Sequence, residues 1–220
     1  DIGVEGVLDP FGSNKKLLSL IEEICRGRVG ALLEHISANN PDALIVVPGY
    51  FPMLSPHSSR SKIFNAWLEV SEVPGVVQSL ANNGVMRPLV FRRLFNKAVE
   101  RSRIWATESE RNLKLAIEAH NARVGRPQAI FIPTPLTEEH SAEAPNTKLF
   151  RMSADGTTTD PVFAERKADC KVAYEELARS TGIKKSWRRC SIAAVGHPDE
   201  AGARLYADAV IRSVGPIDRP

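Results

Sequence analysis

A single histidine, His197, is the residue of this chain whose type and setting point most directly to chemistry. It lies in the stretch "GHPDEAGARLYADAV", between a glycine that lets the backbone turn and a proline that suits the first turn of a helix. A neutral imidazole at such a junction can take a proton from a hydroxyl nucleophile and return it to a leaving group. A histidine that caps a helix and does no chemistry suits the same position, so residue type leaves both interpretations open.

Ser13, in "PFGSNKK", is a candidate nucleophile because it follows a glycine at the start of a predicted helix. Its surroundings match neither a Gly-Asp-Ser block nor the G-x-S-x-G turn of the α/β hydrolases. A helix N-cap is therefore the favoured interpretation of this serine. The stretch also lacks the G-x-x-x-x-G-K-[ST] pattern of a phosphate-binding loop.

Residues that follow the predicted strands are candidates for a substrate pocket. Tyr50, Phe51 and Met53, in "GYFPMLSP", could line an acyl or alkyl pocket, or they could pack as loop residues on the core. His140, in "LTEEHSAEAP", could contact substrate, although a surface-loop histidine is the favoured interpretation.

The remaining histidines and the cysteines do not predict a metal site. His35, His57 and His120 lack the spacing of metal ligands, and we expect His35 and His120 to lie peripherally in helices. The three cysteines have no CxxC spacing, which argues against zinc. A Cys170–Cys190 disulfide is compatible with the sequence, but spacing alone does not show that the geometry fits.

Composition excludes some classes of function. The 220 residues are 43% hydrophobic, which is enough for one domain with a core. The formal net charge of +3 is too small to argue for nucleic-acid binding, and we interpret the basic run "KKSWRRC" at 184–190 as a solvated face. No apolar stretch approaches the roughly 20 residues of a membrane-spanning helix, so we expect no transmembrane segment.

Apolar periodicity predicts the elements that must position these side chains. Apolar residues at three- and four-residue spacings predict a helix over about 14–39, with Ser13 as its N-cap. The wholly apolar runs at 43–47 and 129–132 have no polar face, which is typical of parallel strands covered by helices on both sides.

The other segments are mostly helical or irregular. The pattern over 88–124 predicts a long helix, part of which could stand off the body as a lid or arm. Asp160 and a following proline predict the start of another helix. The remaining expected segments are short helical pieces over 64–81, a polar loop over 134–159, that helix over 160–181, a short apolar piece at 192–195 and a last helix over 198–213.

The alternation of helices and strands predicts a doubly wound α/β domain with a parallel sheet. Only two strong strands are present, whereas sheets of this class usually have about five. A parallel sheet of two strands would leave bare edges. We therefore expect the chain to be the later part of a larger domain, and to be prone to aggregation or loosely folded alone.

The stretch around His197 resembles the last sequence block of the SGNH hydrolases, also called GDSL lipases and esterases. The matching residues are Gly196, His197, Pro198, Ala201, Gly202 and Tyr206. Asp1 matches the aspartate that follows the oxyanion-hole asparagine of related members, and "IGVEGVLDPF" resembles their next loop. "ALIVVPGYFPMLS" and "AIFIPTPLTEEHSAEAPN" resemble the fourth and fifth strands with their loops.

The resemblance implies a three-layer α/β/α fold with a flavodoxin-like parallel sheet of the SGNH type, incomplete at its N-terminal side. Residues 1–220 would form one such domain, with a long helical insertion over about 60–125. The Gly-Asp-Ser nucleophile block would lie upstream of Asp1. The implied activity is that of a serine esterase or lipase on a small-molecule or lipid ester, with His197 as general base and no cofactor; deacetylation of a carbohydrate would use the same chemistry.

One residue departs from the family pattern. Family members usually carry an aspartate three residues before the histidine, where it orients the imidazole, and this chain has Ala194 there. A backbone carbonyl, Asp155, Asp160 or no group at all could take that role. The departure also favours an alternative, a non-catalytic SGNH-like binding or scaffold module. Compartment and oligomeric state stay open.

Overall fold

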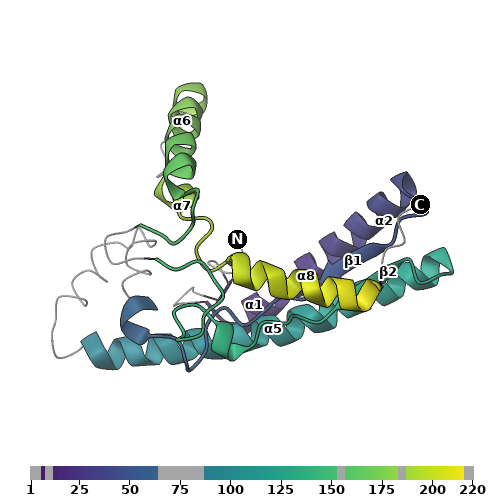
Figure 1. Cartoon of the computed structure of the whole chain (residues 1–220), viewed down its shortest axis with the longest axis horizontal. Coiled ribbons are helices and arrows are strands. Elements are labelled where there is room, and N and C mark those ends of the chain that lie inside the picture. Colours follow the sequence, from purple (N-terminus) through teal and green to yellow (C-terminus); the bar gives the residue numbers. More distant parts are fainter. Residues whose placement is uncertain (1–5, 8–11, 64–86, 153–156, 183–186, 216–220) are drawn as a thin grey trace.

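The computed structural model describes residues 6–7, 12–63, 87–152, 157–182 and 187–215 (Figure 1). The described chain is mostly helical and contains one small parallel sheet, which confirms the mixed α/β class. Asp1, Asp155 and the helical pieces expected over 64–81 lie outside the described residues.

The first helical run is continuous from residue 14 to residue 39, as predicted. It consists of α1 (Asn14–Ile21), a π-helical stretch η2 (Glu22–Arg28) and α2 (Val29–Asn39). Ser13 is the N-cap, because its Oγ accepts a hydrogen bond from the amide of Lys16 at 3.2 Å. The favoured interpretation of Ser13 is therefore confirmed.

The sheet has two strands, β1 (Ile45–Pro48) and β2 (Ala129–Ile132), which pair in parallel. Ile45 lies opposite Ala129 in the register. β2 has the predicted bounds, whereas β1 begins two residues later than predicted and includes its proline. That proline is tolerated because its nitrogen faces away from β2. The hydrogen bond to the Ile132 carbonyl, at 2.8 Å, comes from the amide of the next residue, Gly49.

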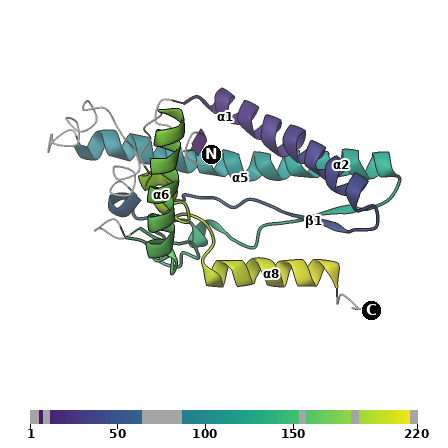
Figure 2. The ribbon, with the colours of Figure 1, turned by 90° about the horizontal axis from the view of Figure 1, so that it is seen from above.

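Helices cover both faces of this sheet. Figure 2 shows α1, α2 and α5 (Arg87–Val124) on one side and α8 (Glu200–Val214) on the other. One apolar cluster joins α2, β1, α5 and β2 through Leu33, Ile45, Ala116, Ile117 and Ala129. This arrangement explains why neither strand has a polar face.

The long helix α5 packs against the body along much of its length. Phe91 and Phe95, near its start, pack with Leu54 of the loop after β1, and Trp105 and Leu113 pack with α1 and η2. The helix that projects from the body is α6 (Phe163–Thr181), at the upper left of Figure 1. Its described contacts are chiefly with the short α7 (Arg188–Ser191).

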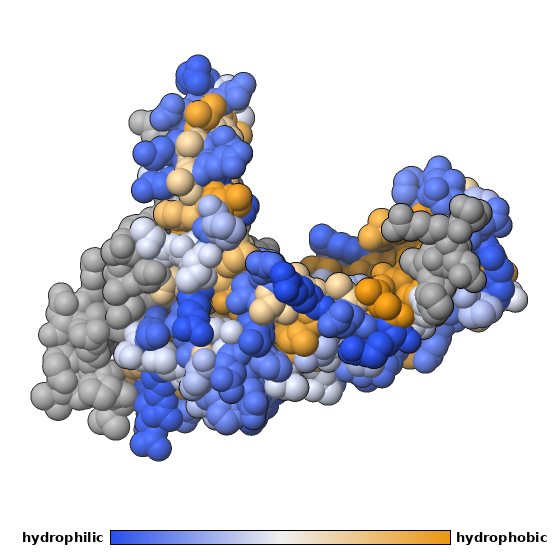
Figure 3. Space-filling model, viewed as in Figure 1, coloured by the Kyte–Doolittle hydropathy of each residue, from blue (hydrophilic) through white to orange (hydrophobic). Residues whose placement is uncertain are grey.

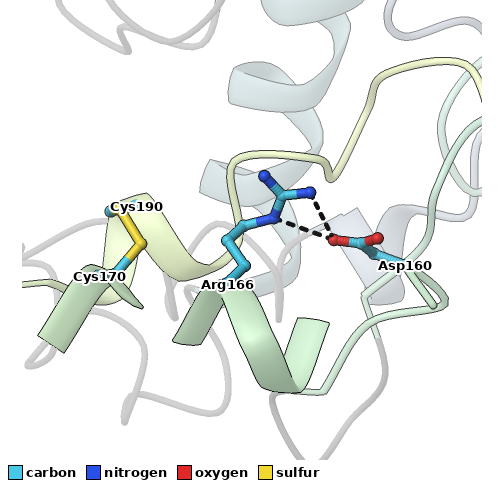
Figure 4. The surroundings of a disulfide bond; sticks show 4 residues. All are labelled: Asp160, Arg166, Cys170 and Cys190. Carbon is cyan, nitrogen blue, oxygen red and sulfur yellow. Dashed lines mark hydrogen bonds and ion pairs between the residues drawn. A yellow bond between two sulfur atoms is a disulfide. The ribbon is translucent and has the colours of Figure 1, made fainter. Parts of the chain in front are cut away.

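A disulfide holds α6 to α7. Cys170 and Cys190 are bonded, with their Cα atoms 5.8 Å apart, so the pairing that spacing could not decide is present (Figure 4). α6 begins at Phe163, three residues later than predicted. Asp160 still accepts a hydrogen bond from the Val162 amide at 3.1 Å, and its side chain forms an ion pair with Arg166.

The short apolar piece at 192–195, for which the sequence predicted no conformation, forms turns. The predicted start of the last helix at Pro198 is wrong. The last helix starts at Glu200 because Pro198 forms an antiparallel bridge with Leu149 and Asp199 becomes the N-cap. The described part of the polar loop expected over 134–159 contains a short 3-10 turn, η3 (Glu138–His140).

Candidate functional site

The carboxyl ends of β1 and β2 meet α8 through one phenol. The Tyr206 hydroxyl donates to the Gly49 carbonyl at 2.8 Å and lies 2.7 Å from Thr134 Oγ1. Gly49 directly follows β1, and Thr134 lies two residues after β2. Tyr206 thus connects the last helix to both strand ends, the edge at which open α/β sheets bind their ligands.

Gly49 is required by the closeness of these strand ends. A Cβ atom at this position would lie 2.8 Å from the Phe131 ring and 3.2 Å from the Thr134 amide nitrogen. A larger residue would require the Phe131 ring to move and the main chain at Thr134 to shift by a few tenths of an ångström. The Pro-Gly pair therefore does more than end the strand, because it permits the approach that Tyr206 then fixes.

His197 lies immediately before α8 in a backbone held by a neighbouring segment. The Phe150 amide donates to the His197 carbonyl at 2.9 Å, and the Gly196 amide donates to the Phe150 carbonyl at 3.0 Å. Gly196 has a φ of 80°, a conformation that favours glycine. The main chain at His197 is thus fixed on both sides.

The His197 side chain is exposed, and within the described residues no hydrogen bond or ion pair reaches its imidazole. The cap of α8 is Asp199, whose Oδ1 accepts from the Gly202 amide at 2.9 Å. The alternative interpretation of His197 as the helix cap is therefore wrong, because the aspartate two residues later has that role.

No acidic group among the described residues orients this imidazole. The Ala194 carbonyl accepts a hydrogen bond at 2.9 Å, but from the main-chain amide of His197 and not from its ring. The Asp160 carboxylate accepts a hydrogen bond from the Arg166 side chain at 3.0 Å (Figure 4) and another from the Val162 amide. Asp160 is thus committed to the start of α6.

Tyr50 lies at the same strand end. Its side chain is 41% exposed, and its ring centroid is 4.6 Å from that of Trp105. Partial burial raises the pKa of the Tyr50 phenol, and the nearby Cys25 thiol adds a smaller rise. Phe51 is half-buried, and Met53 packs against the core cluster of α1 and α5. Tyr50 is therefore the most exposed of these three candidate pocket residues.

His140 is committed to its own loop. Its Nδ1 accepts a hydrogen bond from the Thr137 amide at 3.1 Å and completes a capping box at the start of η3. Its carbonyl also accepts from the Lys148 amide at 3.3 Å. These contacts agree with the favoured interpretation of a loop histidine, and no described contact joins His140 to His197.

Among the described residues, no hydrogen bond or ion pair joins the other histidines to His197 or Tyr206. His35 is exposed on α2 and His57 is exposed in the loop after β1. His120 is 1% exposed on α5, so the expectation that it is peripheral is wrong. Among the described residues, no three His, Cys, Asp or Glu side chains are grouped so that they could hold a metal ion.

Two polar residues at the sheet, Thr134 and Asn121, were not predicted from the sequence. Thr134 lies in a Pro-Thr-Pro stretch that reads as an ordinary loop, and its role depends on contact with Tyr206. Asn121 exchanges two hydrogen bonds of 2.8 Å with the main chain of Ala129. The position of Asn121 in a long polar helix did not indicate this role, because the contact joins α5 to the first residue of β2.

None of the described helices is both long and apolar enough to cross a lipid bilayer. Comparison with models of protein families, with curated proteins and with solved structures found no match to this chain.

Proposed function

We propose that this chain is part of a serine ester hydrolase of the SGNH class, an esterase or lipase that cleaves a small-molecule or lipid ester. His197 is the general base, and the nucleophilic serine is supplied by polypeptide outside residues 1–220. The observation that carries the proposal is an exposed imidazole, without a partner among the described residues, directly before a helix that Tyr206 ties to both strand ends.

The chemistry follows from what an imidazole at this place can do. His197 removes the proton from the serine hydroxyl as its Oγ attacks the ester carbonyl. It then delivers that proton to the oxygen of the leaving alcohol. When water attacks the acyl-enzyme, the ring takes a proton from the water and returns it to the serine Oγ as the acid leaves. The fixed backbone around His197 supports this role, because general-base catalysis depends on a well-placed ring.

The edges of the sheet support a larger parallel sheet that extends beyond β1. The Ile45 amide donates to the Gln128 carbonyl, so Gln128 directs its main-chain groups toward β1. The next residue, Ala129, directs its main-chain groups the other way, away from β1. Asn121 satisfies those outward groups of Ala129, so the first residue of β2 is covered at its outer edge. Val46 faces outward from β1, and no described strand pairs with it. We propose that a strand outside the described residues pairs there, as the three-layer flavodoxin-like fold requires.

A fluorophosphonate probe and short p-nitrophenyl esters test this proposal in the complete polypeptide. We expect one serine outside residues 1–220 to be labelled, and His197→Ala to lower both labelling and kcat/KM at least 100-fold. His35→Ala is the matched control, because His35 is also an exposed histidine but lies within α2 and not before α8. Unchanged ester hydrolysis by His197→Ala would overturn the assignment of the base.

A non-catalytic binding or scaffold module is the second candidate function. Ala194 favours it, because the position three residues before His197 offers no carboxylate to the ring. This candidate predicts that the probe labels no serine in the complete polypeptide and that esters are not hydrolysed above the His197→Ala background. Serine labelling that depends on His197 would exclude it.

A further inference from the structure

We propose that Tyr206 is a positioning residue that sets the direction of the His197 imidazole, an inference that rests on the proposed function. The two residues lie on the same structural unit. His197 lies two residues before Asp199, the N-cap of α8, and Tyr206 lies about two turns inside that helix. Any rotation or sliding of α8 on the sheet would therefore move the histidine as well.

The hydroxyl groups of Thr134 and Tyr206 form a chain of hydrogen bonds in which every donor points the same way. The Leu136 amide donates to Thr134 Oγ1 at 3.2 Å. Tyr206 has one proton, which it donates to the Gly49 carbonyl, so the hydroxyl of Thr134 must donate to Tyr206. Hydrogen bonds linked head to tail in this way strengthen one another. The chain ties α8 to the ends of β1 and β2 at one point.

A second contact fixes the other end of the same unit. The Asp199 amide donates to the Lys148 carbonyl at 2.9 Å. A Cβ atom on Gly202 would lie 2.4 Å from that same carbonyl oxygen, so the helix approaches the 148–150 segment as closely as a glycine allows. With this contact in place, Tyr206 supplies the second anchor that stops α8 from pivoting about its N-terminus.

The ring of His197 has no such anchor of its own. Within the described residues nothing holds the imidazole, and the family's orienting carboxylate is replaced by Ala194. The direction of the ring therefore depends on the main chain that carries it, which the hydrogen bonds with Phe150 and the seating of α8 fix together. In an enzyme with a complete triad the carboxylate would share this task.

The test compares four variants of the complete polypeptide. Tyr206→Phe removes only the hydroxyl, Thr134→Val removes the donor to it, and Thr134→Ser keeps a hydroxyl as the conservative replacement. Ser213→Ala is the matched control, because Ser213 also lies on α8 but its hydroxyl bonds the carbonyl of Ala209 on the same helix. The measurements are kcat and KM for a short p-nitrophenyl ester, and the side-chain NMR resonances of His197.

We expect Tyr206→Phe and Thr134→Val to lower kcat about tenfold to 100-fold with little change in KM, because misplacing a reacting group by about 1 Å costs up to this much. The His197 resonances should shift in both variants, whereas Thr134→Ser and Ser213→Ala should behave as wild type. A purely structural role would lower the melting temperature and leave kcat and the His197 resonances unchanged at temperatures where the protein is folded, which would overturn the inference.

The experiment also separates this inference from the proposed function. If His197→Ala abolishes activity while Tyr206→Phe keeps both kcat and the His197 resonances, the function stands and the positioning role is wrong. If His197→Ala keeps full activity, the proposed function is wrong, and the positioning role in that reaction falls with it.

Discussion

The surroundings of Tyr206 change the acidity of its phenol. Burial raises the pKa of this group; the hydrogen bond with Thr134 acts in the opposite direction, and the nearby Tyr50 adds to the rise. The folded state therefore holds the proton more tightly than the unfolded chain, whose tyrosines have a pKa of about 10. The stability that depends on this proton is fully present below about pH 10 and is lost as the pH rises through the folded-state value.

Tyr206→Phe should accordingly remove one late step from the tyrosine titration. We expect the ultraviolet absorbance of tyrosinate in the wild-type protein to include a phenol that ionises above about pH 10, and this phenol to be missing in the variant. The wild-type protein should also lose stability more steeply with pH in that range than the variant. Tyr174→Phe, which replaces a tyrosine on the projecting helix α6, serves as the comparison. A variant in which the early part of the titration disappears instead would contradict a buried Tyr206.

Single residues were predictable where their role is local. Ser13 caps the helix that follows it, and its type and place in the sequence predicted this. Asn121 and Thr134 act on residues that the fold brings to them, so their types alone carried no signal. His197 and Tyr206 were singled out by position and by family resemblance respectively, and the sequence did not indicate the contact of Tyr206 with both strand ends.

Among the elements, α6 depends on the fewest other parts of the protein. It stands off the body, and the disulfide of Cys170 with Cys190 joins it to α7. Lys171 lies 5.0 Å from the ring centroid of Trp187 and adds a cation–π contact between these two segments. Little apolar packing holds the helix otherwise, since Val172 is 60% exposed on it.

Loss of the disulfide should therefore loosen α6 without unfolding the sheet. The double variant Cys170→Ser, Cys190→Ser removes a crosslink that typically contributes about 2–4 kcal/mol. We expect amide hydrogen exchange to become faster over residues 163–181, while the amides of α5 and α8 keep their wild-type rates. The matched measurement is the wild-type protein treated with a thiol reductant. Unchanged exchange in α6 would mean that other contacts hold the helix.

Element bounds were predictable where the sequence pattern was clear. The helix expected over 88–124 is observed as Arg87–Val124, and β2 has the expected bounds although it has only four residues. The four apolar residues at 192–195 carried too little pattern to separate a strand from a turn. The late start of α8 could not be predicted either, because it follows from the bridge between Leu149 and Pro198, which are distant in sequence.

At the scale of the whole molecule, the two edges of the sheet differ. Asn121 covers the outer main-chain groups of Ala129, whereas the outer edge of β1 pairs with no strand that the structure describes. Figure 3 shows apolar side chains gathered on the surface along α2, β1 and α8. Exposed large apolar residues in and beside these elements include Leu32, Leu44 and Ile211. The sequence predicted bare edges from the number of strands, but it could not indicate that Asn121 covers the first residue of β2.

Residues 1–220 alone should self-associate through the open edge of β1. Leu44 directly precedes this strand and is 47% exposed, so Leu44→Lys places a charge at the edge without emptying the core. We expect light scattering after size-exclusion chromatography to show larger species for the wild-type chain and fewer for this variant. Leu18→Lys is the matched control, because Leu18 is 41% exposed on α1, outside the sheet, and its replacement should leave association unchanged. A wild-type chain that is monomeric and melts cooperatively would show that the β1 edge needs no further strand, and the proposed larger sheet would lose its main support.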